Sequence, residues 1–264
     1  MKQRLNKFRL EAGIVFSYFM VSQLILFPLL PNLFSKLPFA SNGDIRLSLT
    51  IMFSNLKQIA QGDILNIFQL PILFPLSHTL TAGVNLFGQT LLVLPFYLVH
   101  LQNVYIIYNL LTFFAYIAAG YCSYRFVREW ISERWIAWMA GALYILMPFR
   151  VHNIPHLNLM FSFPIPLTLL FFSRFLKKGR LKDLVFFFFS LLSQFLFDLS
   201  LGIFLGIALA VFFLIQQILF GLLPRRSWLF LITAAVLFAL CLAMIFFWDW
   251  KLRISICVTS VNLN

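Results

Sequence analysis

Carboxylates are scarce in this chain, and one of them lies where a carboxylate could do chemistry. Only eight residues are Asp or Glu. Asp44 stands between two very apolar regions, at the start of a segment with one polar face. Its carboxylate could take the proton from an attacking hydroxyl group. It could also be the N-cap of a helix that begins at Ile45, because Asp accepts hydrogen bonds from free backbone N–H groups. The two roles do not exclude each other.

A second polar cluster, FRVHNIPHLN, occupies residues 149–158. It contains the cation Arg150 and two histidines four residues apart, His152 and His156. Two histidines on one face of a helix could bind the same metal ion, but Pro155 between them disfavours a regular helix. The alternative is that both are polar residues at the membrane interface. The sequence leaves open whether a metal or any other cofactor is used.

The segment that follows Asp44 has the pattern of an amphipathic helix. Its apolar residues recur at helical spacing, at Ile45, Leu49, Met52, Leu56 and Ile59. The opposite face is polar or basic and includes Arg46 and Lys57. A helix of this kind lies in the membrane interface. We therefore predict an interfacial helix over residues 45–61, whose two basic side chains could pair with a lipid phosphate.

Two further acids lie at boundaries between segments. Asp63 directly follows Gly62 at the end of the amphipathic segment. Glycine followed by aspartate is typical of turns, so a turn residue is the favoured interpretation of Asp63 and substrate binding the alternative. Asp198 separates two apolar stretches and is most simply a loop acid.

The composition is that of a polytopic membrane protein. The chain is 62% hydrophobic and only 11% charged, whereas a soluble domain carries roughly a quarter charged residues. Its net charge of +12 could indicate nucleic-acid binding. The basic residues, however, form short clusters between apolar stretches, as in cytoplasmic loops, so we expect no nucleic-acid partner. The three cysteines are scattered without a CxxC pair, which disfavours metal or redox chemistry at these residues.

Apolar stretches and basic clusters together predict the topology. The first span, 12–31, follows a basic N-terminus and lacks a small-residue cleavage site, so we interpret it as a retained span that starts in the cytoplasm. The other apolar stretches are 84–101, 104–124, 136–148, 159–175, 184–197, 199–223 and 228–248. Basic clusters at 125–134, 174–182 and 225–226 are predicted to be cytoplasmic.

An odd number of crossings must then separate an external Asp44 from a cytoplasmic Arg125. Two apolar stretches lie between them, so one cannot cross. We predict that 84–101, which contains Pro95, stays outside as a re-entrant or interfacial helix. The alternative is eight full spans, because 84–101 is long enough to cross. The predicted fold is an all-α bundle of about seven or eight transmembrane spans, with interfacial helices in an external loop over residues 32–103.

This layout resembles the GT-C class of membrane glycosyltransferases, which includes aminoarabinose transferases and protein O-mannosyltransferases. The shared pattern is a first span, an external loop with an acid near its start, an interfacial helix, a Gly-Asp pair and a proline-punctuated stretch. Those parts here are Gly43-Asp44, the helix 45–61, Gly62-Asp63 and the segment PILFP at 71–75. In the family the loop acid is catalytic or binds metal, and Asp44 matches it. FRVHNIPHLN occupies the place of a second functional motif, with His152 or His156 where many members have an acid.

The resemblance implies transfer of a sugar from a polyprenyl-phosphate-linked donor to an acceptor at the external face of a bacterial-type inner (plasma) membrane. Asp44 would be the catalytic base, and the substrate-binding residues would be Arg46, Lys57, Asp63, Arg150, His152 and His156. The lipid-linked donor and membrane lipid are the expected partners, and the acceptor is left open. Residues 1–264 would form one GT-C-like domain. Because family members usually have more spans and an external domain, we expect the chain to be the N-terminal part of such a protein.

Two other functions are compatible with the sequence. A polytopic transporter or flippase should carry its polar groups at mid-membrane within the spans, and few such residues occur here apart from Asn109, Gln194 and Gln216-Gln217. A structural membrane fragment without activity is the second alternative.

Overall fold

The structure is a computed structural model. It describes residues 2–38, 43–63, 84, 86–220, 232, 235, 236 and 239. All regular secondary structure in these residues is helical, which confirms the predicted all-α class. Three described segments are long and apolar enough to cross a membrane, namely Phe8–Leu29, Val104–Val127 and Leu157–Lys178. The chain therefore has the make-up of a helical membrane protein, while the predicted seven or eight spans stay a prediction.

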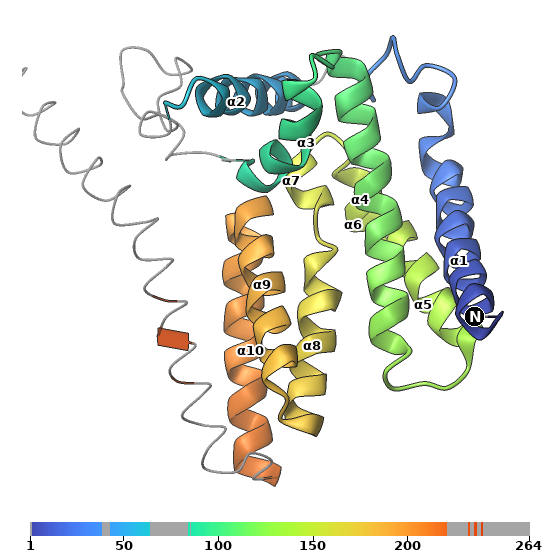
Figure 1. Cartoon of the computed structure of the whole chain (residues 1–264), viewed down its shortest axis with the longest axis vertical. Helices are drawn as coiled ribbons and strands as arrows, with labels where there is room; N and C mark the ends of the chain where they lie inside the picture. Colours follow the sequence, from blue (N-terminus) through green and yellow to red (C-terminus); the bar gives the residue numbers. More distant parts are fainter. Residues whose placement is uncertain are drawn as a thin grey trace, which may run out of the picture.

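The long helices run alternately between the two ends of the molecule (Figure 1). They are α1 (Lys2–Leu26, extended by the 3-10 turn η1, Phe27–Leu29), α4 (Val104–Val127), α5 (Arg134–Leu146), α8 (Pro164–Lys178), α9 (Leu181–Phe197) and α10 (Leu199–Phe220). Local chemistry sets several boundaries. The Asn103 side chain caps α4 by accepting hydrogen bonds from the backbone N–H groups of Tyr105 and Ile106. Gly179, at φ +59°, ends α8 in the left-handed conformation.

The remaining helices of the described residues gather at one end of this bundle. They are α2 (Gly43–Ala60), α3 (Phe87–Leu98), α6 (Pro148–His152) and α7 (Leu157–Met160). Figure 1 shows α2 lying across the end of the bundle, transverse to the long helices, with α3 next to it. We call this end, with α2 and residues 147–163, the site end. The opposite end, with the α4–α5 and α8–α9 turns, is the basic end.

The observed α2 matches the predicted helix over 45–61, with two corrections. It begins at Gly43, so Asp44 lies in its first turn and is not its N-cap. Its buried stripe also differs from the predicted one, because Leu49 and Ile59 are only half-buried while Ser48 and Asn55 are buried. Packing against α3 explains the second difference, since the Asn55 amide donates a hydrogen bond to Thr90 Oγ1 in that helix (3.4 Å).

The apolar stretch 84–101 forms the single short helix α3. Twelve residues span about 18 Å at 1.5 Å per residue, which is less than the roughly 30 Å of a bilayer core. The helix also packs closely on α9, because the ring of Phe197 occupies the space where Gly88 would carry a side chain. Its external location stays a prediction. The segment 71–75 lies outside the described residues, and so does most of the predicted span 228–248.

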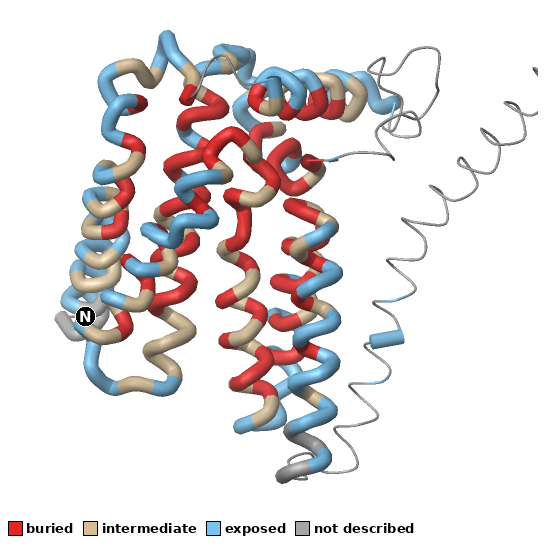
Figure 2. Tube along the Cα trace, turned by 180° about the vertical axis from the view of Figure 1, so that it is seen from behind, coloured by how far each residue is buried: buried red, intermediate tan, exposed pale blue. Residues whose placement is uncertain are grey.

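Figure 2 shows buried residues mainly where the helices face one another and exposed residues on the outer faces of the bundle. Many of the exposed residues are large and apolar. One apolar cluster joins α1, α2, α4 and α5, and a second joins α8, α9 and α10. Leu24, Phe204 and Ile218 are among the outward-facing residues, with 76%, 68% and 80% of their surface exposed. An apolar exterior of this kind is what a lipid environment requires.

Candidate functional site

The structure brings two of the predicted site residues together at the site end. Asp44 lies in the first turn of α2, and His156 directly precedes α7. The distance between Asp44 Oδ2 and His156 Nε2 is 3.8 Å. Both side chains are partly accessible, with 50% of Asp44 and 41% of His156 exposed. The two polar clusters of the sequence therefore meet at one accessible surface.

An Asp–His pair at this separation can perform several kinds of chemistry. It is an ion pair when His156 is protonated, and one water molecule can bridge the two groups when it is not. Either side chain can accept a proton from a hydroxyl group. The pair also offers two of the ligand types that divalent metals use. Within the described residues, no group of three or more His, Cys, Asp or Glu side chains is arranged to hold a metal ion.

Tyr108 of α4 fixes the position of His156. Its hydroxyl group donates hydrogen bonds to the carbonyl oxygens of Ile154 (3.2 Å) and Pro155 (3.1 Å), the two residues before His156. Tyr108 is completely buried, so this contact belongs to the protein interior. The imidazole therefore projects from a backbone that is anchored on α4, a helix long and apolar enough to cross a membrane.

Arg150 anchors the same segment from the inside. Its side chain is fully buried, and its guanidinium group lies over the rings of Tyr116 (4.9 Å) and Tyr144 (5.6 Å). It donates hydrogen bonds to the Ala115 carbonyl oxygen (3.2 Å) and to Ser162 Oγ. Burial lowers the pKa of Arg150, but arginine stays charged in proteins.

This environment bears on the substrate-binding role predicted for Arg150. No Asp or Glu of the described residues lies within ion-pair distance of the guanidinium group. Tyrosine faces and oxygen acceptors compensate the charge instead. The side chain is fully buried in this conformation, and its contacts position residues 147–163. Substrate binding by Arg150 stays a prediction.

A third contact attaches the segment to the α9–α10 corner. The Asn158 amide donates a hydrogen bond to Asp198 Oδ2. The other carboxylate oxygen of Asp198 accepts a hydrogen bond from the backbone N–H of Leu201 (2.7 Å) at the start of α10. Asp198 is buried, so its interpretation as a simple loop acid was incomplete. It is an N-cap that also holds the polar cluster of residues 149–158 in place.

The other predicted site residues are spread over the site end. Arg46 is exposed, but it follows Asp44 by two residues and so points to roughly the opposite side of α2. Lys57 is exposed in the last turn of α2, about 20 Å along the helix axis from Asp44. His152 is exposed at the end of α6, and a turn separates it from His156. The two histidines therefore do not share one regular helix, as Pro155 had indicated.

Asp63 has a turn role, the interpretation favoured by its sequence. Gly62 adopts φ +75°, and its N–H donates to the Ile59 carbonyl oxygen (3.0 Å). The Asp63 N–H donates to the Gln58 carbonyl oxygen (2.9 Å). Together these bonds form a Schellman motif that ends α2. Asp63 thus lies at the far end of α2 from Asp44.

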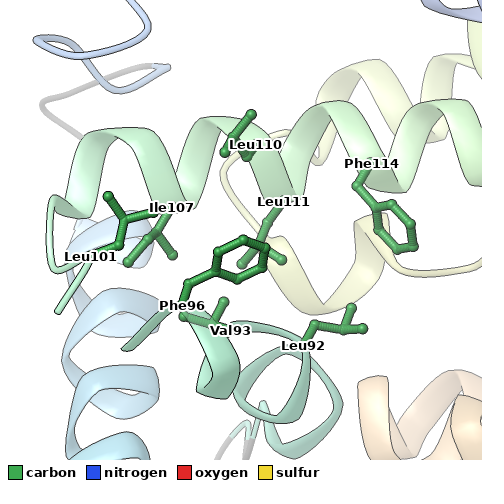
Figure 3. Close-up of a pocket in the computed structure, with 8 residues that line it drawn as sticks. All are labelled: Leu92, Val93, Phe96, Leu101, Ile107, Leu110, Leu111 and Phe114. Atoms are coloured by element: carbon green, nitrogen blue, oxygen red, sulfur yellow. The ribbon is translucent and has the colours of Figure 1, made fainter. Parts of the chain in front are cut away.

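An apolar cavity of about 390 Å³ lies between α3 and α4 (Figure 3). Its lining is formed by Leu92, Val93, Phe96, Leu101, Ile107, Leu110, Leu111 and Phe114. Ile107 is the immediate neighbour of Tyr108, which holds the backbone next to His156. The cavity and the Asp44–His156 pair therefore lie at the same end of α4.

Sequence reasoning did not assign roles to two adjacent residues of α4. Tyr108 holds the backbone before His156, as described above. Asn109 donates hydrogen bonds to the carbonyl oxygens of Leu33 (3.0 Å) and Lys36 (2.9 Å), which fixes the chain after α1. The available signal was a pair of adjacent hydrogen-bonding residues inside an apolar span, where polar groups are costly and need partners.

No protein-family model matches the chain, and no curated protein or solved structure matches it either. The resemblance to the GT-C class consequently remains a prediction from layout and motifs.

Proposed function

We propose that the chain is a membrane glycosyltransferase, or part of one, that moves a sugar from a polyprenyl-phosphate-linked donor to an acceptor hydroxyl group. The reaction would take place at the site end, on the external face of the membrane. The observation that carries this proposal is the Asp44–His156 pair, an accessible base and a potential cation 3.8 Å apart on a surface next to the apolar bundle.

The proposed step uses each member of the pair once. Asp44 accepts the proton of the acceptor hydroxyl group as that oxygen forms a bond to the anomeric carbon of the sugar. The bond from the anomeric carbon to the phosphate oxygen breaks, and polyprenyl phosphate leaves with both electrons of that bond. An imidazole N–H of His156 donates a charge-assisted hydrogen bond to the leaving phosphate and stabilises its negative charge. No covalent enzyme intermediate is required.

Two further features support a lipid-linked donor. The cavity between α3 and α4 has an apolar lining and suits a hydrocarbon chain. Arg46 and Lys57 are exposed along α2, where each could contact phosphates in the membrane interface.

The test measures transfer in membranes that contain the chain. Such membranes are incubated with radiolabelled polyprenyl-phosphate sugars, and the label that leaves the organic-soluble fraction is counted, which requires no knowledge of the acceptor. We expect Asp44→Asn to reduce this release about 10²–10⁴-fold, the range that general-base catalysis contributes. Asp63→Asn, at the far end of α2, is the matched control and should retain most of the activity.

The same assay separates the proposal from its rivals. A flippase would move the donor between leaflets and leave the label in the lipid fraction. A structural fragment would change neither the chemical form nor the location of the donor. Release at the wild-type rate by the Asp44→Asn chain would remove the catalytic role of this residue.

A further inference from the structure

The basic end carries an excess of cations. Residues 128–135 and 174–183 contain seven basic and three acidic residues. These two segments touch each other, because Glu129 forms ion pairs with Arg174 (2.7 Å) and Lys178 (3.6 Å). They therefore form one continuous surface, which we call the basic surface.

The three acidic residues of this surface are either paired with neighbouring side chains or buried. The carboxylate of Glu129 is shared by Arg174 and Lys178, and Asp183 is buried in the first turn of α9. Glu133 lies near Arg128 and accepts a hydrogen bond from Ser132. Among the described residues, the exposed cations Arg134, Lys177, Arg180 and Lys182 have no carboxylate within 4.0 Å.

Exposed apolar groups lie next to these cations. Trp130 and Trp135 are 59% and 64% exposed, and the Lys177 ammonium group lies 3.6 Å from the centre of the Trp130 ring. Tryptophan prefers the headgroup level of a bilayer. The surface therefore has the composition of a protein region that meets lipid headgroups.

An apolar stripe leads away from the cations along α9. Leu181, Val185 and Phe189 recur every four residues on one face and are 61%, 58% and 67% exposed. The stripe begins between Arg180 and Lys182. A phospholipid could thus place its phosphate against these two cations and lay an acyl chain along the stripe. A soluble anion could use only the first of these contacts.

We propose that the basic surface is a binding site for anionic phospholipid, centred on Arg180 and Lys182 with the α9 stripe as the acyl-chain contact. Charge complementarity selects an anionic headgroup over a zwitterionic one. The interaction does not depend on the function proposed for the site end, which lies at the opposite end of the bundle (Figure 1).

The test compares lipids added to the purified full chain in neutral detergent. Dioleoyl phosphatidylglycerol should raise the thermal unfolding midpoint, because a ligand that binds the folded state stabilises it. Dioleoyl phosphatidylcholine and inorganic phosphate at the same concentrations should raise it much less. Each cation near an anionic surface strengthens binding about fivefold. The double variant Arg180→Gln/Lys182→Gln should therefore need about 25-fold more phosphatidylglycerol for the same shift.

A matched double variant controls for loss of charge alone. Arg9→Gln/Lys36→Gln removes two exposed cations that lie outside the basic surface and should respond to phosphatidylglycerol as the wild type does. Should the Arg180/Lys182 variant fold poorly, the wild-type response is measured at rising NaCl, where screening should weaken it. Equal shifts with phosphatidylcholine or inorganic phosphate would overturn the proposal. An unchanged response in the Arg180/Lys182 variant, an equal loss in the control variant, or a salt-independent shift would overturn it as well.

Discussion

At the scale of single residues, Asp44 combines two effects that a substitution can separate. Its carboxylate lies in the first turn of α2, where a negative charge interacts favourably with the helix dipole by about 0.3–1 kcal/mol. Half of the side chain is exposed, and asparagine keeps its size and one of its hydrogen-bond-accepting oxygens. Asp44→Asn should therefore change the stability by less than about 1 kcal/mol. A large loss of transfer in a folded variant would then be attributable to the missing base.

Glu129 predicts a pH dependence at the basic end. Burial alone would raise the pKa of Glu129, but the hydrogen bond and charge of Arg174, with the charges of Lys178 and Lys177, lower it below its ordinary value of 4.5. A lowered pKa means that the ionised carboxylate stabilises the folded state above pH 4.5. This contribution is lost as the pH falls through the lower, folded-state pKa.

Comparison with Glu129→Gln tests this pH dependence. At pH 7 the variant should be less stable than the wild type, on the order of 1 kcal/mol for a partly screened pair. The difference between their thermal midpoints should shrink below pH 4.5, since the wild type then loses its charge and the variant has none to lose. A difference that stays constant from pH 7 to pH 3 would contradict the ion-pair interpretation.

At the scale of elements, residues 147–163 position His156 through three attachments to neighbouring helices. Tyr108 and Asn158 provide two of them, and Arg150 provides the third by joining α6 to α4 and to Ser162. Met147 has an extended backbone because it precedes Pro148, so α5 cannot continue into α6. The two helices in this segment are only five and four residues long, too short to be stable alone, so side-chain contacts hold the segment in one conformation.

Arg150→Lys should disturb this segment although it keeps the charge. A lysine ammonium group cannot reproduce the planar fork that contacts Ala115 and Ser162. One buried acceptor would lose its partner, at a cost of about 1–3 kcal/mol. We expect a lower thermal midpoint and, for the proposed reaction, a reduced rate of sugar release because His156 is no longer fixed. A variant with wild-type stability would show that the fork is dispensable.

The α4–α5 contact depends on two glycines. A Cβ atom on Gly141 would lie 2.5 Å from the Gly120 carbonyl oxygen and closer still to the Tyr18 hydroxyl group. Gly141→Ala should therefore push the helices apart and cost about 1–3 kcal/mol, measured by thermal unfolding in detergent. Gly13→Ala is the control, since a Cβ there has no neighbour within 4 Å and alanine favours a helix. Equal stabilities of the two variants would contradict the close contact.

At the scale of the whole molecule, the helices were largely predictable and the contacts between them were not. Periodic apolar stretches separated by signals such as Gly179 define helices from local sequence alone. The neighbourhood of Arg150 requires side chains from α4 and α5, so its burial could not be read from the cluster at 149–158. Charged residues are usually exposed, so nothing in the sequence indicated that Arg150 is buried. The meeting of Asp44 and His156 likewise depends on how α2 packs across the bundle.

The alternating direction of the helices makes the two ends of the molecule testable as two sides of a membrane. Asn153 lies at the site end between α6 and α7, and Ser132 lies in the α4–α5 turn at the basic end. The basic excess of that turn predicts that it is cytoplasmic.

Cys241 and Cys257 are first replaced by Ser, whereas the buried Cys122 can remain. Asn153→Cys should then react with a membrane-impermeant thiol reagent in intact cells. Ser132→Cys should react only after the cells are opened. Reaction of both variants in intact cells would mean that the ends do not lie on opposite sides, and reaction of Ser132→Cys alone would invert the orientation and place Asp44 and His156 in the cytoplasm.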